Sequence, residues 1–410
     1  MSNKSVVMRE CDRANKARNV NEGFVESQKF FQKIEGDLLM SGNYACDLEL
    51  LTKMIHAYMQ QSDVPTIVLT SHGNLLEQLE EMPEIEVFGE RNLNYHPMYG
   101  MNMQQICRLI RLAGEEWGCS SLMDKVLLYG MAVMEVVGTH YVVSLPAISY
   151  LLMNGDDFIA DLALTEGLPV VIADNIRGNQ EAGLMFRRIV ERLEKTFENV
   201  AEPASESGWS IQMAGKSEMP HIAFYQYSQN QNLMNAYLKE ELYSALQHAK
   251  KLRIIADEIL IVDEKDELLK FLIEMKRIGK IELILCSENA RNVLADEKLN
   301  FTNACVFPHA SVSAMENVSE ALFGKYLFHY PVQTVGKPPN VFFTLKKDEH
   351  WTIATENRLK VREVDLHEQT GLFGQECEKM AVKIGQKYTV FLVPVQEFLY
   401  GAQQRLLVVK

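Results

Sequence analysis

Two acids, Asp257 and Glu258, directly follow the mostly apolar run Leu252–Ala256. In phosphoryl transfer, one carboxylate of such a pair can hold magnesium through water, and the other can polarise the attacking water. If the run is a strand of a parallel sheet, both acids lie at its carboxyl edge, where ligands bind. The same pattern is equally typical of any buried strand that meets a polar loop. Both interpretations therefore stay open for the pair taken alone.

Apolar runs that alternate with helical segments are the elements that must position this pair. Pro65–Thr70 is a continuous apolar run closed by Ser-His-Gly, which predicts a buried parallel strand. Strands that alternate with helices form βαβ units, with a parallel sheet covered on both faces. The other predicted strands are 85–88, 168–174, 252–257, 281–286 and 304–307, and the predicted helices are 47–60, 74–81, 180–201, 232–250, 266–278 and 289–298.

Strand signals are absent between Tyr99 and Glu166, where helical periodicity predicts a helical insertion. The run Val126–Met153 is apolar enough to suggest a membrane span of ~20 residues. Gly138-Thr139 interrupts this run, and Ser144-Leu145-Pro146 has the cap and first-turn proline of a new helix. We therefore expect two buried helices in this segment and no membrane association.

The order of these elements resembles the HerA–FtsK superfamily of motor ATPases, including the TraG-like coupling proteins and the HerA-type DNA pumps. Those families follow their acidic pair with an Arg-x-x-Gly helix end, here Lys276-Arg277-Ile278-Gly279, and with a strand that closes on a polar sensor, here Glu288. Residues 92–98 and the strand at 168–174 with its basic helix also resemble family features. The resemblance covers about residues 37–330. It implies an α/β fold with a RecA-like, mostly parallel sheet, helices on both faces, a helical insertion and a small β-containing C-terminal extension.

Composition and the alternation of strands and helices, together with this resemblance, give the expected domain boundaries. We expect a polar N-terminal lead at 1–27 and a RecA-like core in two parts, 28–98 and 167–335, on either side of the insertion at 99–166. Short apolar runs at 341–345, 350–354 and 359–364 predict a β-rich extension at 336–410, either as an appendage or as an edge of the sheet.

The departures from the family pattern concern the phosphate loop, which corresponds to residues 41–47. A working loop needs glycine-rich backbone, a lysine that reaches the β- and γ-oxygens, and a serine or threonine for magnesium. Gly42 is present, but Cys46 stands at the lysine position and Asp47 at the hydroxyl position. A carboxylate beside a triphosphate is repulsive at ~4 Å even after screening. We expect ATP to bind poorly here.

Other departures agree with a lost ATPase. The sensor is Glu288 instead of Gln, and Thr70-Ser71-His72-Gly73 lacks the Asp that relatives tend to place before His-Gly. Asp257 and Glu258 are then remnants of a catalytic pair. Our first hypothesis is a catalytically degenerate, motor-like protein without a cofactor, which serves as an interaction or assembly subunit of a DNA-transfer or mobile-element system. Its partners would be an active ATPase or further copies of itself.

Two alternatives stay open. The first is an active ATPase with ATP and Mg²⁺, an atypical loop and catalysis by Asp257 and Glu258; it would need a cation near Cys46, for which the candidates are Lys53, Arg277 and Lys280. The second is an α/β scaffold unrelated to nucleotide hydrolysis.

Composition narrows the partners and the compartment. With 41 Lys and Arg against 55 Asp and Glu, the net charge is −14. Such a protein repels phosphate, so nucleic acid is expected to bind only through a localised basic surface. The seven cysteines form no Cys-x-x-Cys pair, which indicates a reducing, cytoplasmic location. The histidines form no paired motif, and we predict no metal site.

Overall fold

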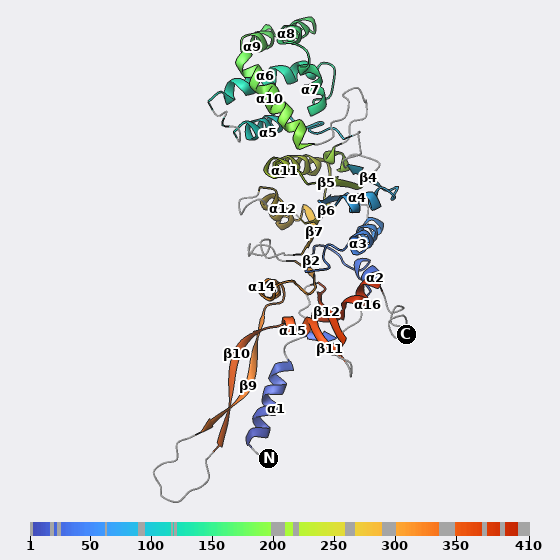
Figure 1. The fold of residues 1–410 in the computed structure, drawn as a ribbon, viewed down its shortest axis with the longest axis vertical. Helices are drawn as coiled ribbons and strands as arrows, with labels where there is room; N and C mark the ends of the chain where they lie inside the picture. The colour runs from blue at the N-terminus through green and yellow to red at the C-terminus, as the bar shows by residue number, and fades with distance from the viewer. Residues whose placement is uncertain are drawn as a thin grey trace, which may run out of the picture. The chain divides into compact units, whose positions relative to one another are not determined.

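The computed structural model describes residues 3–16, 20–22, 26–61, 64–88, 95–115, 118, 121–197, 210–215, 221–258, 267–288, 301–335, 349–370, 375–385 and 390–400. The chain forms two compact units. The first unit combines residues 1–58 with 286–410, and the second unit is the continuous segment 59–285. Their elements are labelled in Figure 1.

The sheet of the second unit has the parallel arrangement that the sequence predicts. Its strands pair in the order β7-β6-β3-β5-β4, and β3 is parallel to both of its neighbours. Every residue of β3 and β6 is buried, which agrees with their mostly apolar sequences. The bounds are β3 (Thr66–Thr70), β4 (Ile85–Phe88), β5 (His221–Tyr225), β6 (Leu252–Asp257) and β7 (Ile281–Ser287).

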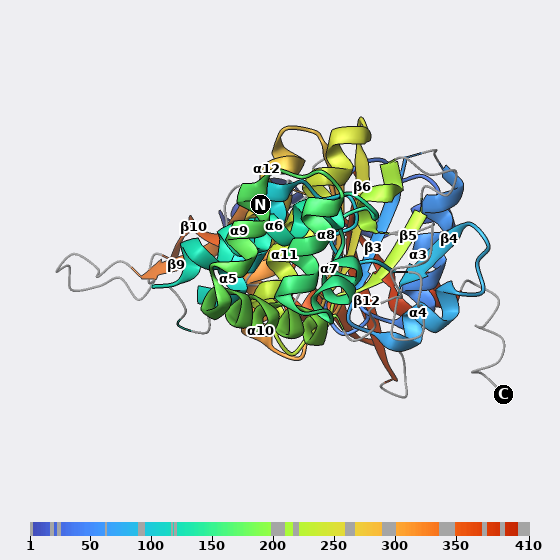
Figure 2. The same cartoon turned by 90° about the horizontal axis from the view of Figure 1, so that it is seen from above.

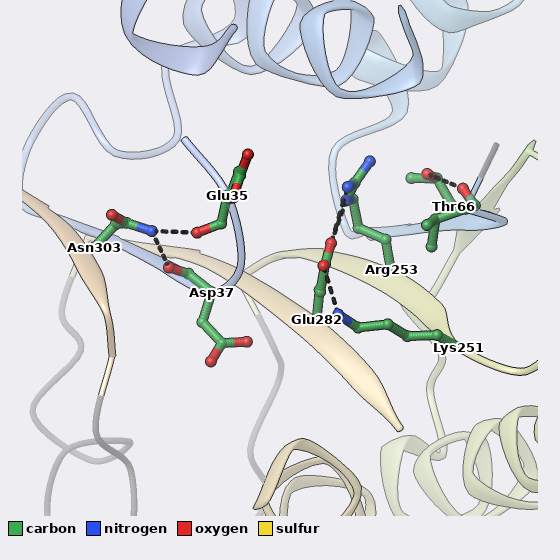
Figure 3. A network of polar contacts seen from close by, with 8 residues as sticks. Glu35, Asp37, Thr66, Lys251, Arg253, Glu282 and Asn303 are labelled. Carbon is green, nitrogen blue, oxygen red and sulfur yellow. Dashed lines mark hydrogen bonds and ion pairs between the residues drawn. The ribbon is translucent and has the colours of Figure 1, made fainter. Parts of the chain in front are cut away.

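Helices lie on both faces of this sheet, as predicted. Figures 1 and 2 show α4 (Gly73–Leu79) on one side, and α11 (Gln231–His248) with α12 (Glu267–Arg277) on the other. At the amino edge, Arg253 and Lys251 both bind the carboxylate of Glu282, with shortest contacts of 2.8 and 2.7 Å (Figure 3). This ion-pair network joins the first residues of β6 and β7.

The predicted helical insertion is present. Ser144 caps α7 by accepting a hydrogen bond from the Ala147 amide, and the apolar run 126–153 forms the two separate helices that were expected. No helix in the described part of the chain is long and apolar enough to cross a membrane. The bounds are α5 (Met103–Glu115), α6 (Met123–Val137), α7 (Leu145–Leu152), α8 (Asp156–Thr165), α9 (Val170–Arg177) and α10 (Gln180–Thr196), followed by the short 3₁₀ helix η2 (Ile211–Gly215).

The strand predicted at 168–174 is wrong, because this segment forms α9. A short apolar run cannot be assigned to strand or helix by its hydrophobicity alone. Ala173 and Ile176, three residues apart, are buried, whereas Val170 and Val171 are exposed, which is a helical pattern. Among the described residues from α5 to α10, all regular elements are therefore helices.

The first unit has its own run of paired strands, in the order β1-β13-β12-β8-β2, with β11 beside β12. β2 and β8 are parallel, and β12 is antiparallel to β8. The C-terminal strands therefore extend the sheet and are not an appendage. The bounds are β1 (Val20–Glu22), β2 (Leu38–Ser41), β8 (Asn303–Val306), β11 (His367–Thr370), β12 (Gln375–Lys383) and β13 (Val390–Pro394).

Aromatic packing and one asparagine hold this sheet to its helices. Phe30, Phe31 and Phe307 surround Phe398, with ring centroids 5.6–6.2 Å from it. The amide of Asn303 donates to the carbonyl oxygens of Glu35 and Asp37 at 2.9 Å each, next to β2 (Figure 3). The helices are α2 (Ser27–Phe31), α3 (Leu48–Gln61), α14 (Val312–Phe323), α15 (Glu363–Leu366) and α16 (Val395–Tyr400).

A two-stranded ribbon completes the first unit. It consists of β9 (Lys325–Val335) and β10 (Glu349–Leu359), and α1 (Asn3–Asn15) packs against it. The polar N-terminal lead thus contains a helix that the sequence did not indicate; its buried residues are Val7 and Cys11, four apart.

The tail predictions have mixed outcomes. The strand predicted at 350–354 lies inside β10. The strand predicted at 359–364 is wrong apart from its first residue, because β10 ends at Leu359 and α15 begins at Glu363. The predicted elements at 289–298 and 341–345, and residues 92–94, lie outside the described residues.

Candidate functional site

The loop at residues 41–47 connects β2 to α3 in the first unit, as a phosphate loop connects strand and helix. Gly42 has a φ of +114°, a conformation that L side chains rarely adopt. A Cβ at this position would lie 2.6 Å from the Phe307 carbonyl oxygen and 2.7 Å from that of Pro308. Glycine is therefore required at position 42, because the backbone of Phe307 and Pro308 leaves no room for a Cβ.

The backbone amides of the loop donate to carbonyl oxygens of the protein. Gly42 donates to Ser287 at 3.2 Å, and Asn43 donates to Pro308 at 2.8 Å. Within the loop, Ala45 donates to Gly42 and Asp47 donates to Tyr44. These four amides cannot bind a phosphate unless they give up their present partners.

The carboxylate of Asp47 lies at the N-terminus of α3. Its Oδ1 accepts a hydrogen bond of 2.9 Å from the Leu50 amide, which is an N-capping contact. The N-terminus of a helix carries partial positive charge and favours an anion. Asp47 supplies that anion from within the chain, at the end of the helix that would otherwise face a phosphate.

Side chains of the loop are also tied to neighbouring elements. The hydroxyl of Tyr44 donates to Glu378 Oε2 on β12 at 2.6 Å, and this bond, together with burial, raises the pKa of Tyr44 to about 12. His309 Nδ1 donates to the Phe307 carbonyl oxygen, so the neutral ring accepts the Ser41 hydroxyl at Nε2, 2.9 Å away. Burial lowers the pKa of His309 and favours that neutral ring. Cys46 is half-buried and forms no disulfide.

A second polar group, the acid cluster, lies at the carboxyl edge of the sheet in the second unit. It consists of Thr70, His72, Gln226 and Asp257. Asp257 is completely buried, and its Oδ2 accepts hydrogen bonds from the Thr70 hydroxyl at 2.7 Å and from His72 Nδ1 at 2.6 Å. The other oxygen, Oδ1, is buried without a hydrogen-bond partner in the described part of the chain. The carboxylate therefore has capacity for one further donor or cation.

The sequence did not indicate the role of Gln226. Its side-chain amide donates to the carbonyl oxygens of Asp257 at 3.0 Å and of Glu258 at 2.9 Å. Glu258 has a φ of +52°, which is uncommon for a residue other than glycine and costs of the order of 1–3 kcal/mol. Gln226 supports the backbone of the two acids where this strained conformation occurs.

Two of the remaining candidate residues, Arg277 and Lys280, lie at the other edge of the sheet from Asp257. Arg277 is exposed at the last position of α12, before β7 begins, whereas Asp257 lies at the end of β6. Because the Leu252 amide donates to the Lys280 carbonyl oxygen, the first residues of β6 and β7 are neighbours, and Arg277 and Lys280 lie at the amino edge.

In the first unit, Glu288 is exposed and follows β7, and the ammonium group of Lys53 is 2.6 Å from Glu49 and also donates to the Leu399 carbonyl oxygen. Among the described residues, no group of three or more His, Cys, Asp or Glu could hold a metal ion.

Comparison with known proteins places the fold. No protein-family model matches the chain, and no curated protein matches it. Solved structures of the bacterial conjugative coupling protein TrwB are similar to it. Its unbound form covers 94% of this chain and 91% of its own, at 12% identity and a TM-score of 0.52. A sulphate complex covers 91% and 89%, at 10% identity and a TM-score of 0.53.

The complex of TrwB with ADP and Mg²⁺ covers 88% of this chain and 85% of its own, at 12% identity and a TM-score of 0.51. At such identities the likeness concerns the fold. The resemblance to coupling proteins, and with it the RecA-like α/β architecture, is thereby confirmed at the level of fold.

Proposed function

We propose that this chain is a coupling-protein-like subunit that has lost ATP hydrolysis and serves an interaction or assembly role in a DNA-transfer system. The observation that carries the proposal is the carboxylate of Asp47, which caps α3 at the point where a phosphate loop would offer amides to a nucleotide. The amides of Gly42 and Asn43 are engaged as well. The residues present at this loop do not fit a triphosphate.

The alternative of an active ATPase draws support from the acid cluster. Asp257 is at the expected strand end, and its Oδ1 lacks a partner in the described region. It draws none from the candidate cations: Lys53 pairs with Glu49 and the Leu399 carbonyl, and Arg277 and Lys280 lie at the amino edge. We therefore retain Asp257 and Glu258 as a remnant pair, and Arg277 and Glu288 only as positions that match the family pattern.

The partners under this proposal are proteins, either an active ATPase or further copies of the chain. Binding of nucleic acid through a localised basic surface and a cytoplasmic location stay predictions. TrwB is described as a conjugative coupling protein, and the role in DNA transfer is proposed on that likeness of fold.

Calorimetric titration with ATP and Mg²⁺, together with a phosphate-release assay, tests the proposal. We expect no binding up to millimolar nucleotide and no turnover in the wild-type chain. The double variant Cys46→Lys with Asp47→Thr restores the two missing functional groups, and binding by this variant alone would support loss through the loop. Saturable binding by the wild type, with turnover abolished by Glu258→Gln, would establish the active ATPase instead.

A further inference from the structure

The helices α6–α9 of the insertion expose an unusual number of large apolar side chains. Figure 2 shows these helices gathered together within the second unit. Nine such side chains are exposed between Met123 and Arg177, a stretch that the structure describes completely. Apolar surface concentrated in this way is typical of an interaction site. The nine are Leu128, Tyr141, Val142, Tyr150, Met153, Phe158, Leu164, Val170 and Val171.

Four of these side chains lie on or next to α7, and we call them the α7 patch: Tyr141, Val142, Tyr150 and Met153. The rings of Tyr141 and Tyr150 are in edge contact, with centroids 6.3 Å apart. Met153 follows Tyr150 by about one helical turn and is 81% exposed. Tyrosine and methionine are enriched at protein–protein interfaces, where they give large contact areas.

Hydrogen bonds hold the backbone of the α7 patch in place. The Leu145 amide donates to the Pro97 carbonyl oxygen at 2.8 Å. The guanidinium group of Arg187, on α10, donates to the carbonyl oxygens of Leu152 and Asn154 and to the carboxylate of Asp156. A surface with a fixed backbone loses little conformational entropy when a partner binds.

The net negative charge of these helices favours a positively charged partner. Residues 123–177 contain seven Asp and Glu but only two Lys and Arg. One of these two cations, Arg177, already pairs with Asp161. Glu166 lies 3.2 Å from His140, next to Tyr141, so carboxylate is present beside the α7 patch. Phosphate polymers and anionic lipid surfaces are repelled by such a surface.

We propose that the α7 patch binds a basic, amphipathic segment of a partner protein. Complementary charge brings the segment to the acidic helices, and apolar contact with Tyr150 and Met153 holds it there. Symmetric pairing of two α7 patches would bring together two surfaces of the same net charge, which disfavours a second copy as the occupant. This inference rests on the proposed function, because it supplies the surface through which an interaction subunit would act.

Fluorescence anisotropy with a labelled amphipathic helical peptide of leucine and lysine tests the inference on the full chain. We expect binding that weakens with salt, and no binding of the same peptide with glutamate in place of lysine. The double variant Tyr150→Ser with Met153→Ser should weaken binding by about tenfold or more. Both side chains are exposed, so folding should be unaffected. Ile278→Ser, which removes a 54% exposed side chain outside the patch, is the matched control and should change nothing.

Three results would overturn the inference. They are equal binding of both peptides, equal loss in Ile278→Ser and the patch variant, and patch-dependent binding of duplex DNA or of phosphatidylglycerol vesicles in place of the peptide. The outcome is separable from that of the proposed function. ATP binding by the wild type would refute the loss of ATPase activity and would not alter the peptide result. Failure of the peptide to bind would not alter the calorimetric result with ATP.

Discussion

The loop at residues 41–47 and the acid cluster both lie at the end of a buried strand, yet their polar groups are satisfied to different degrees. In the loop, protein carbonyl oxygens and the Asp47 carboxylate have taken the amides that a phosphate would need. In the acid cluster, the buried carboxylate of Asp257 still has one oxygen without a partner among the described residues. The amides of the loop are therefore more fully engaged than the carboxylate of the acid cluster.

The two units also differ in net charge. Residues 59–285 carry 19 Lys and Arg against 33 Asp and Glu, whereas the rest of the chain carries 22 of each. The whole net charge of −14 therefore belongs to the second unit. A nucleic-acid contact through a basic surface is electrostatically less costly on the first unit.

The largest expected effect is that of Gly42→Ala, which tests whether the close packing of the loop stabilises the fold. Gly42→Ala places a Cβ against two backbone oxygens at a positive φ, so we expect the free energy of unfolding to fall by about 3 kcal/mol or more. Urea denaturation measures this change. Gly36→Ala is the control: its φ is +83° but its Cβ would meet nothing within 4 Å, so about 1–2 kcal/mol is expected. Equal losses in both variants would show that the close approach at Gly42 is unimportant.

Asp257→Ala tests whether the acid cluster stabilises the second unit. The variant removes the acceptor of the Thr70 hydroxyl and of His72, and we expect a loss of about 2–3 kcal/mol in urea denaturation. Glu258→Gln should cost much less, since its side chain is not fully buried. An increase in stability on removal of Asp257 would instead indicate that the buried carboxylate is retained for binding at the expense of folding.

Asp47→Ala should cost about 1 kcal/mol, because α3 loses its N-cap. Asp47→Ser keeps a capping oxygen without the negative charge and should remain close to the wild type in denaturation experiments. If the alanine variant is as stable as the serine variant, the carboxylate does not cap the helix in solution, and the contrast between the loop and the acid cluster loses its main support.

The smallest effect is the titration of Tyr44. The pKa of this phenol is raised from 10 to about 12, so its contribution to stability is complete below pH 10 and is lost as the pH rises toward 12. A difference titration of tyrosinate absorbance, wild type minus Tyr44→Phe, should show this late transition. Glu378→Gln removes the negative charge of the main partner and should move the transition to lower pH. An unchanged transition in Glu378→Gln would show that Tyr44 does not bond to β12 in solution.

Local pattern predicted two strands whose every residue is buried, Thr66–Thr70 and Leu252–Asp257, because a mostly apolar run between polar turns is typical of a buried parallel strand. It did not predict β2, which is also fully buried. The same reasoning failed at Val170–Arg177, where four apolar residues begin a helix. It also missed α1, whose buried face consists of little more than Val7 and Cys11. Such a narrow face leaves almost no periodic signal.

The candidate site was only partly predictable. The substitutions at Cys46 and Asp47 are visible in the sequence, and Asp is a preferred N-cap, but the engagement of the Asn43 amide with Pro308 requires the fold. Asp257 was recognised from its strand. Its contacts with His72 and Gln226 depend on the strand order β6-β3-β5, which joins residues far apart along the chain.

The way the chain divides has a consequence for biosynthesis. The second unit is one continuous segment, so it can leave the ribosome complete and fold while the rest is still being made. The first unit combines residues 1–58 with 286–410. Within the described part of the chain, the backbone of Val20–Glu22 pairs with Val390–Leu392 in β13 and with no other strand. Val20–Glu22 therefore cannot form this pairing until more than three hundred further residues have been synthesised. We expect this unit to close last and to be the part that most needs a chaperone during synthesis.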